Sequence, residues 1–299
     1  MSYHKGKWTR RIAPYLFVAP ALVIFVVFVL YPAFETFRYS LYDWRGFGPM
    51  EWAGFANYER ALFSDGVFKQ AFKNNVLYFL GTIVSEVLFG LLVALILSRS
   101  LPLFGTLRIM FFTPMVLSMT IIGLLWSYVY HPQIGLLNVV LRSAGYPQLT
   151  KAWLGSAQTI IPAVVVTSGW TYAGFYMLIF YSAIKGIPAS LLEAARLDGA
   201  TEGRIFLHVI IPLLRPILII ALLLCWTGSF QAFNLFWVMT GEGGGPYHSG
   251  EIVSTWVMKQ AFQFSRMGYG SALAVIMTVV VAISSILYML YTSRQSVEY

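Results

Sequence analysis

The side chains that most often perform chemistry are scattered in this sequence. The histidines lie far apart, in separate stretches, at His4, His131, His208 and His248. A shared metal ion needs three or four ligands that converge on one point, and this spacing does not suit one. The sequence contains no G-x-x-x-x-G-K-[ST] phosphate loop and no G-x-S-x-G nucleophile motif. We therefore expect no catalytic site, no metal and no other cofactor in this chain, and a protein that is not an enzyme.

One ionisable residue, Glu86, falls near the middle of a long apolar run. A charge at that depth in a membrane is costly, so such a residue is a candidate functional site. The alternative is a protonated or hydrogen-bonded side chain that only contacts a neighbouring helix. A proton-coupled carrier usually has several such groups in chains, so a single acid gives that class little support. The residues alone leave the role of Glu86 open.

The composition indicates that lipid surrounds the elements that carry these side chains. The 299 residues are 58% hydrophobic and 11% charged, against about 45–50% and about 25% in soluble domains. The mean hydropathy is +0.71. The formal net charge of +8 does not indicate nucleic-acid binding, because no basic cluster alternates with aromatic residues. The single cysteine, Cys225, excludes an internal disulfide. We predict an all-α, polytopic membrane protein.

Six apolar runs are long enough to cross a bilayer, which takes about 20 helical residues. Within a single membrane domain of residues 1–299, they cover about residues 12–34, 75–97, 109–130, 159–184, 217–240 and 267–292. The first run follows basic residues, as in a signal peptide, but it is too long for one and lacks a small-residue cleavage site. The density of Lys and Arg near the ends of the spans favours cytoplasmic N- and C-termini.

A glycine-rich cluster, Gly241-Glu242-Gly243-Gly244-Gly245-Pro246, follows the fifth run. A phosphate-binding loop would continue with Lys and Ser or Thr and then a helix, and this cluster does not. We therefore predict a plain turn on the outer side.

A segment at residues 185–216 falls on the cytoplasmic side in this topology. Pro188 ends the preceding helix, and Ser190 with Glu193 three residues later predicts a capping box at the start of a new helix. The segment therefore predicts a short helix lying beneath the membrane.

A reversal follows that short helix. Asp198-Gly199 is a turn signal, because glycine readily adopts the left-handed backbone conformation. A second helix is expected from about residue 200 to 210, ending near Pro212. The residues alone favour an elbow of two helices that serves as a surface anchor or as a docking element.

This elbow resembles the EAA loop of ABC importer permeases, the membrane subunits of binding-protein-dependent uptake systems. The residues that carry the resemblance are Glu193, Ala194, Ala195, Asp198, Gly199, Ala200, Phe206, Ile211 and Pro212. In that family the helices of the loop seat in a groove on an ATP-binding subunit and couple its nucleotide state to gating. The resemblance also implies that Glu193 pairs with a basic residue of that subunit.

Two further stretches are similar to carbohydrate permeases of the maltose-transporter type. One is W-A-G-F-A-N-Y at residues 52–58, and the other is F-N-L-F-W-V-M-T at residues 233–240 with the glycines that follow. The resemblance implies a second homologous permease in a heterodimer, two ATP-binding subunits that bind ATP and Mg, and an extracytoplasmic solute-binding protein. It also implies the inner membrane of a prokaryote.

The fourth and fifth runs contain the aromatic and hydrogen-bonding groups of which sugar sites are made. These residues are Trp170, Thr171, Tyr172, Phe175, Tyr176, Trp226, Ser229, Phe230, Gln231, Phe233, Asn234 and Trp237. Aromatic residues also fill helix bundles without binding a solute, so the pattern does not by itself identify a site.

The resemblance to the maltose permease implies sugar contacts at six positions, Thr171, Tyr172, Phe175, Cys225, Ser229 and Ala232. Cys225 and Ala232 form hydrogen bonds poorly and Tyr172 is bulky, which argues against maltose itself but not against another sugar. The partner permease is the alternative location of the site.

The reading that we favour is one half of the translocation pathway of an ATP-driven sugar importer. No Lys or Arg occurs in the third, fourth or fifth run. A permease for glycerol phosphate or a related polyol ester is therefore a weaker alternative, unless the partner supplies cations. A proton-coupled secondary carrier would need internal repeats and more intramembrane acids. A membrane-embedded enzyme would need a nucleophile with its base, or a metal set.

Overall fold

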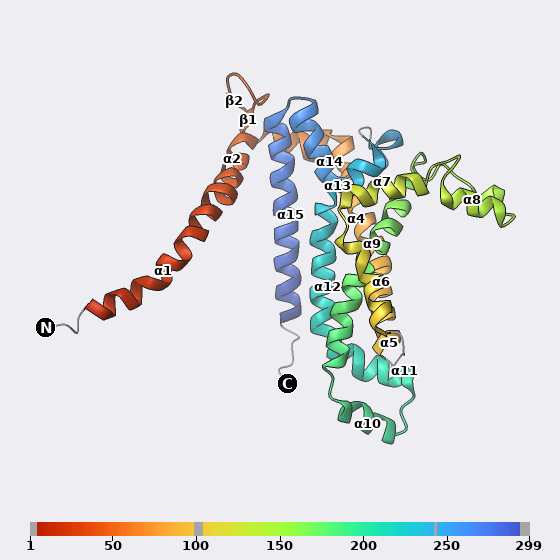
Figure 1. Cartoon of the computed structure of the whole chain (residues 1–299). Helices are drawn as coiled ribbons and strands as arrows, with labels where there is room; N and C mark the ends of the chain where they lie inside the picture. The colour runs from red at the N-terminus through yellow and green to blue at the C-terminus, as the bar shows by residue number, and fades with distance from the viewer. Residues whose placement is uncertain (1–4, 99–103, 242–243, 294–299) are drawn as a thin grey trace. The chain divides into compact units, whose positions relative to one another are not determined.

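The computed structural model describes residues 5–98, 104–241 and 244–293, and most of these are helical (Figure 1). The chain divides into two compact units, one of residues 1–64 with 257–276 and one of residues 65–256 with 277–299. Glu242 and Gly243 of the glycine-rich cluster lie outside the described residues.

The first unit begins with helices and a short hairpin. Its elements are α1 (Lys5–Phe25), the π-helical η1 (Val26–Leu30), α2 (Tyr31–Ser40), β1 (Tyr42–Asp43), β2 (Glu51–Trp52), α3 (Ala56–Glu59) and the π-helical η2 (Arg60–Ser64). The π-helical η7 (Lys259–Gln263) and the first part of α15 (Met267–Ser293) complete it.

The second unit holds most of the remaining helices. Its elements are α4 (Gly66–Thr82), the π-helical η3 (Ile83–Leu88), α5 (Phe89–Ser98), α6 (Phe104–Val116), α7 (Met119–Val129), α8 (Leu136–Ser143), the 3-10 helix η4 (Pro147–Leu149), α9 (Ile160–Lys185), α10 (Ala189–Leu197), α11 (Glu202–Ile205), the π-helical η5 (Phe206–Ile210), α12 (Ile211–Gln231), α13 (Phe233–Thr240), the 3-10 helix η6 (Pro246–His248) and most of α14 (Val253–Met258).

In the first unit, the stretch at residues 52–58 fastens the hairpin to the end of α2. β1 pairs antiparallel with β2, and the ring of Tyr42 packs edge-on against that of Trp52 with 5.1 Å between the centroids. The amide of Asn57 donates to the backbone carbonyls of Ser40 at 2.9 Å and Tyr42 at 3.0 Å. A two-stranded hairpin is marginal alone, so these side-chain bonds help to hold it.

The predicted all-α membrane fold with six spans is confirmed. Five helices in the described residues are long and apolar enough to cross a membrane, namely Pro14–Ser40, Gly66–Ser98, Ile160–Lys185, Glu202–Gln231 and Met267–Thr292. The sixth span is a pair of helices, Gly105–Val116 and Met119–Val129, bent by 100° at the break between them.

The third span is therefore broken, where a continuous helix over residues 109–130 was expected. Pro114 lies inside α6 and cannot donate the backbone hydrogen bond to the preceding turn. Ser118 is extended, with φ −62° and ψ 135°, before α7 begins at Met119. Hydropathy does not detect such a break, because apolar residues continue through it.

The expected fifth span at residues 217–240 is likewise two helices. The side-chain amide of Asn75 donates to the backbone carbonyl of Ser229 at 2.8 Å. In a continuous helix that carbonyl would accept from Phe233, four residues later. Instead, Asn75 bonds this carbonyl where the spiral is interrupted at Ala232, so that α12 ends at Gln231 and α13 starts at Phe233 as a separate helix.

Helix α9 is the centre of the second unit, where it packs against α4, η3, α5, α6 and α12. In Figure 1 it lies beside α5 and α12. Two glycines permit the close approach of its neighbours. A Cβ on Gly90 of α5 would lie 2.8 Å from the Tyr176 Cβ, and a Cβ on Gly174 would overlap the carbonyl oxygen of Phe111. The buried core of Met177, Phe180 and their neighbours forms around this contact.

The expected reversal at Asp198-Gly199 is present. Gly199 has φ +79°. Its amide donates to the Arg196 carbonyl and the Ala200 amide donates to the Ala195 carbonyl, both at 3.0 Å. This pair of bonds is the Schellman arrangement that ends a helix at a left-handed glycine.

Two details of the elbow differ from the expectation. The prediction of a Ser190–Glu193 capping box is wrong, because Pro188 is the N-cap of α10 and no side chain caps this helix. Ser190 already lies in the first turn, since the Leu191 amide donates to the Pro188 carbonyl. The second helix does not stop near Pro212 but continues as Glu202–Gln231. The π-helical η5 precedes Pro212, which lies in the first turn of α12, where a missing N–H is tolerated.

The glycine-rich cluster after α13 includes the expected turn. Gly241, Gly244 and Gly245 all have positive φ. The Gly245 amide donates to the Thr240 carbonyl at 3.1 Å. Among the described residues of the cluster, the backbone therefore folds back on the end of α13.

Candidate functional site

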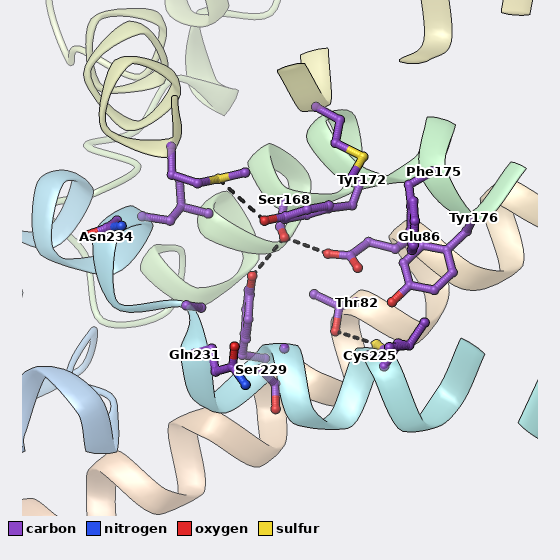
Figure 2. Close-up of a pocket in the computed structure, with 17 residues that line it drawn as sticks. Thr82, Glu86, Ser168, Tyr172, Phe175, Tyr176, Cys225, Ser229, Gln231 and Asn234 are labelled. Carbon is purple, nitrogen blue, oxygen red and sulfur yellow. Dashed lines mark hydrogen bonds between the residues drawn. The ribbon is translucent and has the colours of Figure 1, made fainter. Parts of the chain in front are cut away.

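A cavity of about 450 Å³ lies inside the second unit (Figure 2). Its walls come from α4, η3, α9, α12 and α13, and from Met115 and Met119 on either side of the break in the third span. Its volume falls within the range of small-molecule sites, about 300–1,000 Å³. Both broken spans border the cavity. The backbone is not helical at these breaks, so some of its N–H and C=O groups lack partners within a helix.

A chain of hydrogen bonds crosses the cavity wall between α4, α9 and η3 (Figure 2). The Tyr78 hydroxyl donates to the Ser168 Oγ at 2.8 Å, and the Ser168 hydroxyl donates to the Glu86 Oε1 at 2.6 Å. All three side chains are buried. The carboxyl of Glu86 is therefore the terminal acceptor of an ordered polar chain.

The local backbone explains why Glu86 reaches this position. Glu86 lies in the π-helical η3, which widens the helix by one residue per turn. The facing helix approaches closely at Gly169, where a Cβ would lie 2.6 Å from the Cβ of Ser85. The close approach brings Ser168 within hydrogen-bonding distance of Glu86.

A second polar pair lies between α4 and α12. The Thr82 Oγ1 and the Cys225 Sγ are 3.2 Å apart. The Thr82 hydroxyl is also within 2.9 Å of the Phe79 carbonyl. Since that carbonyl takes the hydroxyl proton, the thiol of Cys225 is the donor to Thr82. The Ser229 hydroxyl is turned back to the Trp226 carbonyl at 2.7 Å.

Aromatic rings of α9 form another side of the cavity. Phe175 and Tyr176 meet edge to face, with centroids 5.3 Å apart. The Tyr172 hydroxyl donates to the Met119 sulfur at 3.7 Å. Gln231 and Asn234 add amide groups from the α12–α13 break. The cavity thus combines ring faces with hydrogen-bonding side chains.

The structure brings five of the six positions named for sugar contact to this cavity, and these are Tyr172, Phe175, Cys225, Ser229 and Ala232. Thr171 does not line it, because its side chain is buried and donates to the Thr167 carbonyl at 2.9 Å. Of the other aromatic and polar candidates, Tyr176, Gln231 and Asn234 line the cavity, whereas Trp170, Trp226, Phe230, Phe233 and Trp237 do not.

Sequence reasoning missed the contribution of the second span. Tyr78 and Thr82 line the cavity together with Glu86. These residues follow one another at intervals of four, which places them on one helix face. The four-residue spacing from Glu86 back to Thr82 and Tyr78 was the sequence signal that could have identified this face. Ser168 carried no comparable signal.

The cavity is electrostatically unusual. Among the described residues that line it, Glu86 is the only Asp or Glu, and none is Lys, Arg or His. No group of three or more potential metal ligands occurs in the described part of the chain. The cavity therefore presents hydroxyls, amides, aromatic rings and one carboxyl.

The positions named for docking lie on the elbow and at the start of the fifth span. Glu193, Ala194, Asp198, Gly199 and Pro212 are exposed, and Ala195, Ala200, Phe206 and Ile211 are half-buried. The apolar Leu197 is 89% exposed. Arg196 and Glu202 form an ion pair at 3.1 Å across the reversal. The elbow therefore presents a preformed surface with an uncovered apolar side chain.

Comparisons with known proteins give a consistent result. Residues 86–297 match the family described as "Binding-protein-dependent transport system inner membrane component". The chain is 41% identical over 286 residues to the "Probable ABC transporter permease protein YurN" of Bacillus subtilis (strain 168), covering 94% of this chain and 96% of the relative. It is 33% identical over 285 residues to the "Diacetylchitobiose uptake system permease protein NgcF" of Streptomyces coelicolor, covering 92% and 80%.

A solved structure shares the fold. The match is to a chain of a bacterial ABC transporter involved in the import of the acidic polysaccharide alginate, with a TM-score of 0.83. The two chains are 20% identical, and the match covers 99% of this chain and 100% of the other.

Proposed function

The chain belongs to the family of binding-protein-dependent transport system inner membrane components, and we propose that it forms one half of the translocation pathway of an ATP-driven sugar importer. It is a multi-pass transport subunit of the membrane. ATP hydrolysis, in this proposal, takes place on separate subunits that bind ATP and Mg.

The observation that carries the sugar assignment is the lining of the cavity in the second unit. A sugar presents an apolar C–H face and a rim of hydroxyls, so its site needs ring faces beside hydrogen-bonding groups. The rings of Phe175 and Tyr176 supply the first, and the amides of Gln231 and Asn234 supply the second. The volume of about 450 Å³ suits a small solute or one end of a longer one.

The names of similar proteins support the same class of solute. One relative is a diacetylchitobiose uptake permease, and another, 26% identical, is a "Probable starch degradation products transport system permease protein AmyD". A phosphate ester is less favoured, because the described lining contains a carboxyl and no cation.

The proposed dock for an ATP-binding subunit is the elbow of α10 and α11. In Figure 1 these helices lie beyond the end of α9. The exposed Leu197 and Glu193 provide an apolar anchor and a charge on one short helix. The Schellman turn at Gly199 fixes the reversal, and the exposed Arg196–Glu202 pair bridges it. A contact of this kind can transmit a movement of the ATPase to α9 and α12.

We propose the remaining partners by analogy with other permeases of this kind. They are a second homologous permease in a heterodimer, two ATP-binding subunits and an extracytoplasmic solute-binding protein. The elbow is then cytoplasmic, as are both termini, and the hairpin and the turn after α13 face outward. The location is the inner membrane of a prokaryote.

Purification of the tagged chain from its native membrane tests the proposal. We expect recovery of a second six-span protein and a nucleotide-binding subunit, with ATP turnover that a sugar-loaded binding protein stimulates. Purification of the chain alone, with proton-linked uptake in liposomes, would refute it in favour of a secondary carrier.

A further inference from the structure

Only part of the hydrogen-bonding capacity of the Glu86 carboxyl is satisfied within the described protein. Its Oε1 accepts the hydrogen bond from Ser168 at 2.6 Å. Among the described residues, no other hydrogen bond or ion pair reaches the carboxyl. Glu86 is 5% exposed and lines the cavity. One carboxyl oxygen therefore remains available to whatever enters the cavity (Figure 2).

The cavity provides no counter-charge for this acid. A carboxylate in a low-dielectric interior is costly unless a cation pairs with it, and proteins usually place Lys, Arg or His there. None of the described lining residues is of that kind. The neighbours of Glu86 are instead the hydroxyl of Ser168 and the tyrosines of α4 and α9. Whenever Glu86 is ionised, the cation that balances it must therefore arrive with the solute.

The local backbone is consistent with a functional position, although four other segments of the described chain are also π-helical. π-helical turns occur frequently at functional sites. Here the π-helical η3 presents Glu86 to the cavity. The bond from Ser168 needs only an acceptor oxygen, which a glutamine amide would provide equally well. What the carboxyl adds to the cavity is the capacity to hold a negative charge.

We propose that Glu86 is a specificity-determining residue that pairs with the ammonium group of an amine-bearing sugar. The proposal rests on the assignment of this cavity as a sugar site and narrows its solute class. The ammonium group binds the open oxygen of Glu86, while Phe175 and Tyr176 contact the ring and can add cation–π attraction. Gln231 and Asn234 bind hydroxyls on the opposite side.

The chain contains its own reporter for this site. Cys225 is its single cysteine and lines the same cavity. A solute in the cavity shields the thiol from N-ethylmaleimide, so the concentration that gives half protection measures binding. The experiment uses the complex purified with its partner subunits at neutral pH, where much of the amine of glucosamine is protonated and the thiol still reacts. Labelling of Cys225 is read on this chain by mass spectrometry. Glucosamine, glucose and N-acetylglucosamine are the probes, because they differ mainly at one substituent.

We expect glucosamine to protect Cys225 at a concentration at least about tenfold lower than glucose or N-acetylglucosamine, which corresponds to about 1.4 kcal/mol. In Glu86→Gln this preference disappears while the protection by glucose persists, and Glu86→Asp retains part of the preference. Glu59→Gln removes an exposed carboxyl in α3 and serves as the matched control with wild-type behaviour. The shift in unfolding temperature caused by each sugar gives a second measure that does not depend on labelling.

Two results would overturn the proposal, and they have different meanings. Equal protection by the three sugars, or a preference that survives in Glu86→Gln, refutes the pairing with an amine and leaves the sugar site in place. No protection and no thermal shift with any sugar refutes the sugar site itself together with the pairing.

Discussion

The left-handed glycine of the elbow gives the sharpest test of the proposed coupling between this permease and an ATP-binding subunit. Gly199 has φ +79°, and no atom lies within 4 Å of the place where a Cβ would stand. A side chain there meets no steric neighbour, so the whole cost of a substitution comes from the backbone conformation. That cost is about 1–2 kcal/mol for an ordinary residue. Asparagine is among the residues that tolerate this region best.

The magnitude follows from these figures. A cost of about 1–2 kcal/mol lowers the ratio of folded to unfolded elbow by a factor of about 5–30. If the ATP-binding subunit recognises the folded elbow, its affinity falls by up to that factor in Gly199→Val, falls less in Gly199→Ala and stays near the wild-type value in Gly199→Asn. Gly199→Asp keeps the tolerant backbone but places a second charge beside Asp198, so it separates charge at the dock from strain.

The assay is titration of the ATP-binding subunit onto the reconstituted permease pair, with binding and sugar-stimulated ATP turnover recorded for each variant. Membrane levels of the permease, measured in parallel, control for misfolding. We expect the order Asn, Ala, Val in loss of affinity, and uncoupled ATP turnover in Gly199→Asp. Equal affinity for Gly199→Asn and Gly199→Val would refute the reasoning, because those two variants differ most in backbone strain.

Three further predictions concern packing and the cavity wall, and all use unfolding temperature in detergent as the measurement. Gly174→Ala should destabilise the chain by about 1–3 kcal/mol, because its Cβ would overlap a backbone oxygen, whereas Gly203→Ala, with nothing within 4 Å, should not. An equal effect of the two would contradict the packing described around α9. Asn75→Ala removes bonds to the end of α12 and to the Val253 amide and should cost about 1–3 kcal/mol for each buried group left unpaired. An unchanged melting temperature would show that water replaces them. Ser168→Ala should cost about 1–3 kcal/mol, since it leaves a buried tyrosine hydroxyl without its acceptor, and a melting temperature equal to that of the wild type would exclude a structural role for this chain of bonds.

The spans and the elbow could be predicted because their signals are local. A run of apolar residues reports the thickness of the bilayer directly. The Asp198-Gly199 pair reports a reversal through the conformational freedom of one residue, and Gly199 indeed has φ +79°. Neither signal depends on which helix lies next to which.

The break between α12 and α13 could not be predicted, because a residue distant in the sequence takes part in it. An amide from α4 bonds the Ser229 carbonyl where α12 ends at Gln231. Pro212 does not end its helix, and a π-helical turn precedes it. Hydropathy is blind to both effects.

The sequence predicted the part of the cavity lining that comes from the fourth and fifth spans, but not the part that comes from the second. Residues of the fourth and fifth spans were named by aromatic content and by resemblance, and five of six line the cavity. Thr171 points elsewhere because its hydroxyl satisfies its own helix at Thr167. The contribution of the second span depends on the π-helical turn that presents Glu86, and single-sequence periodicity does not reveal such a turn.

The adjacent residues Asn74 and Asn75 give the second unit a mechanical property. The amide of Asn74 donates to the carbonyls of Ser249 and Glu251 in the turn after α13, at 3.0 and 2.7 Å. Asn75 holds the end of α12 beside the cavity and the amide of Val253. Two neighbouring positions of α4 thus bind both the cavity wall and the turn after α13. A displacement of α4 would therefore move both together. In the proposed orientation, a binding protein that contacts this turn would act on the cavity wall through α4.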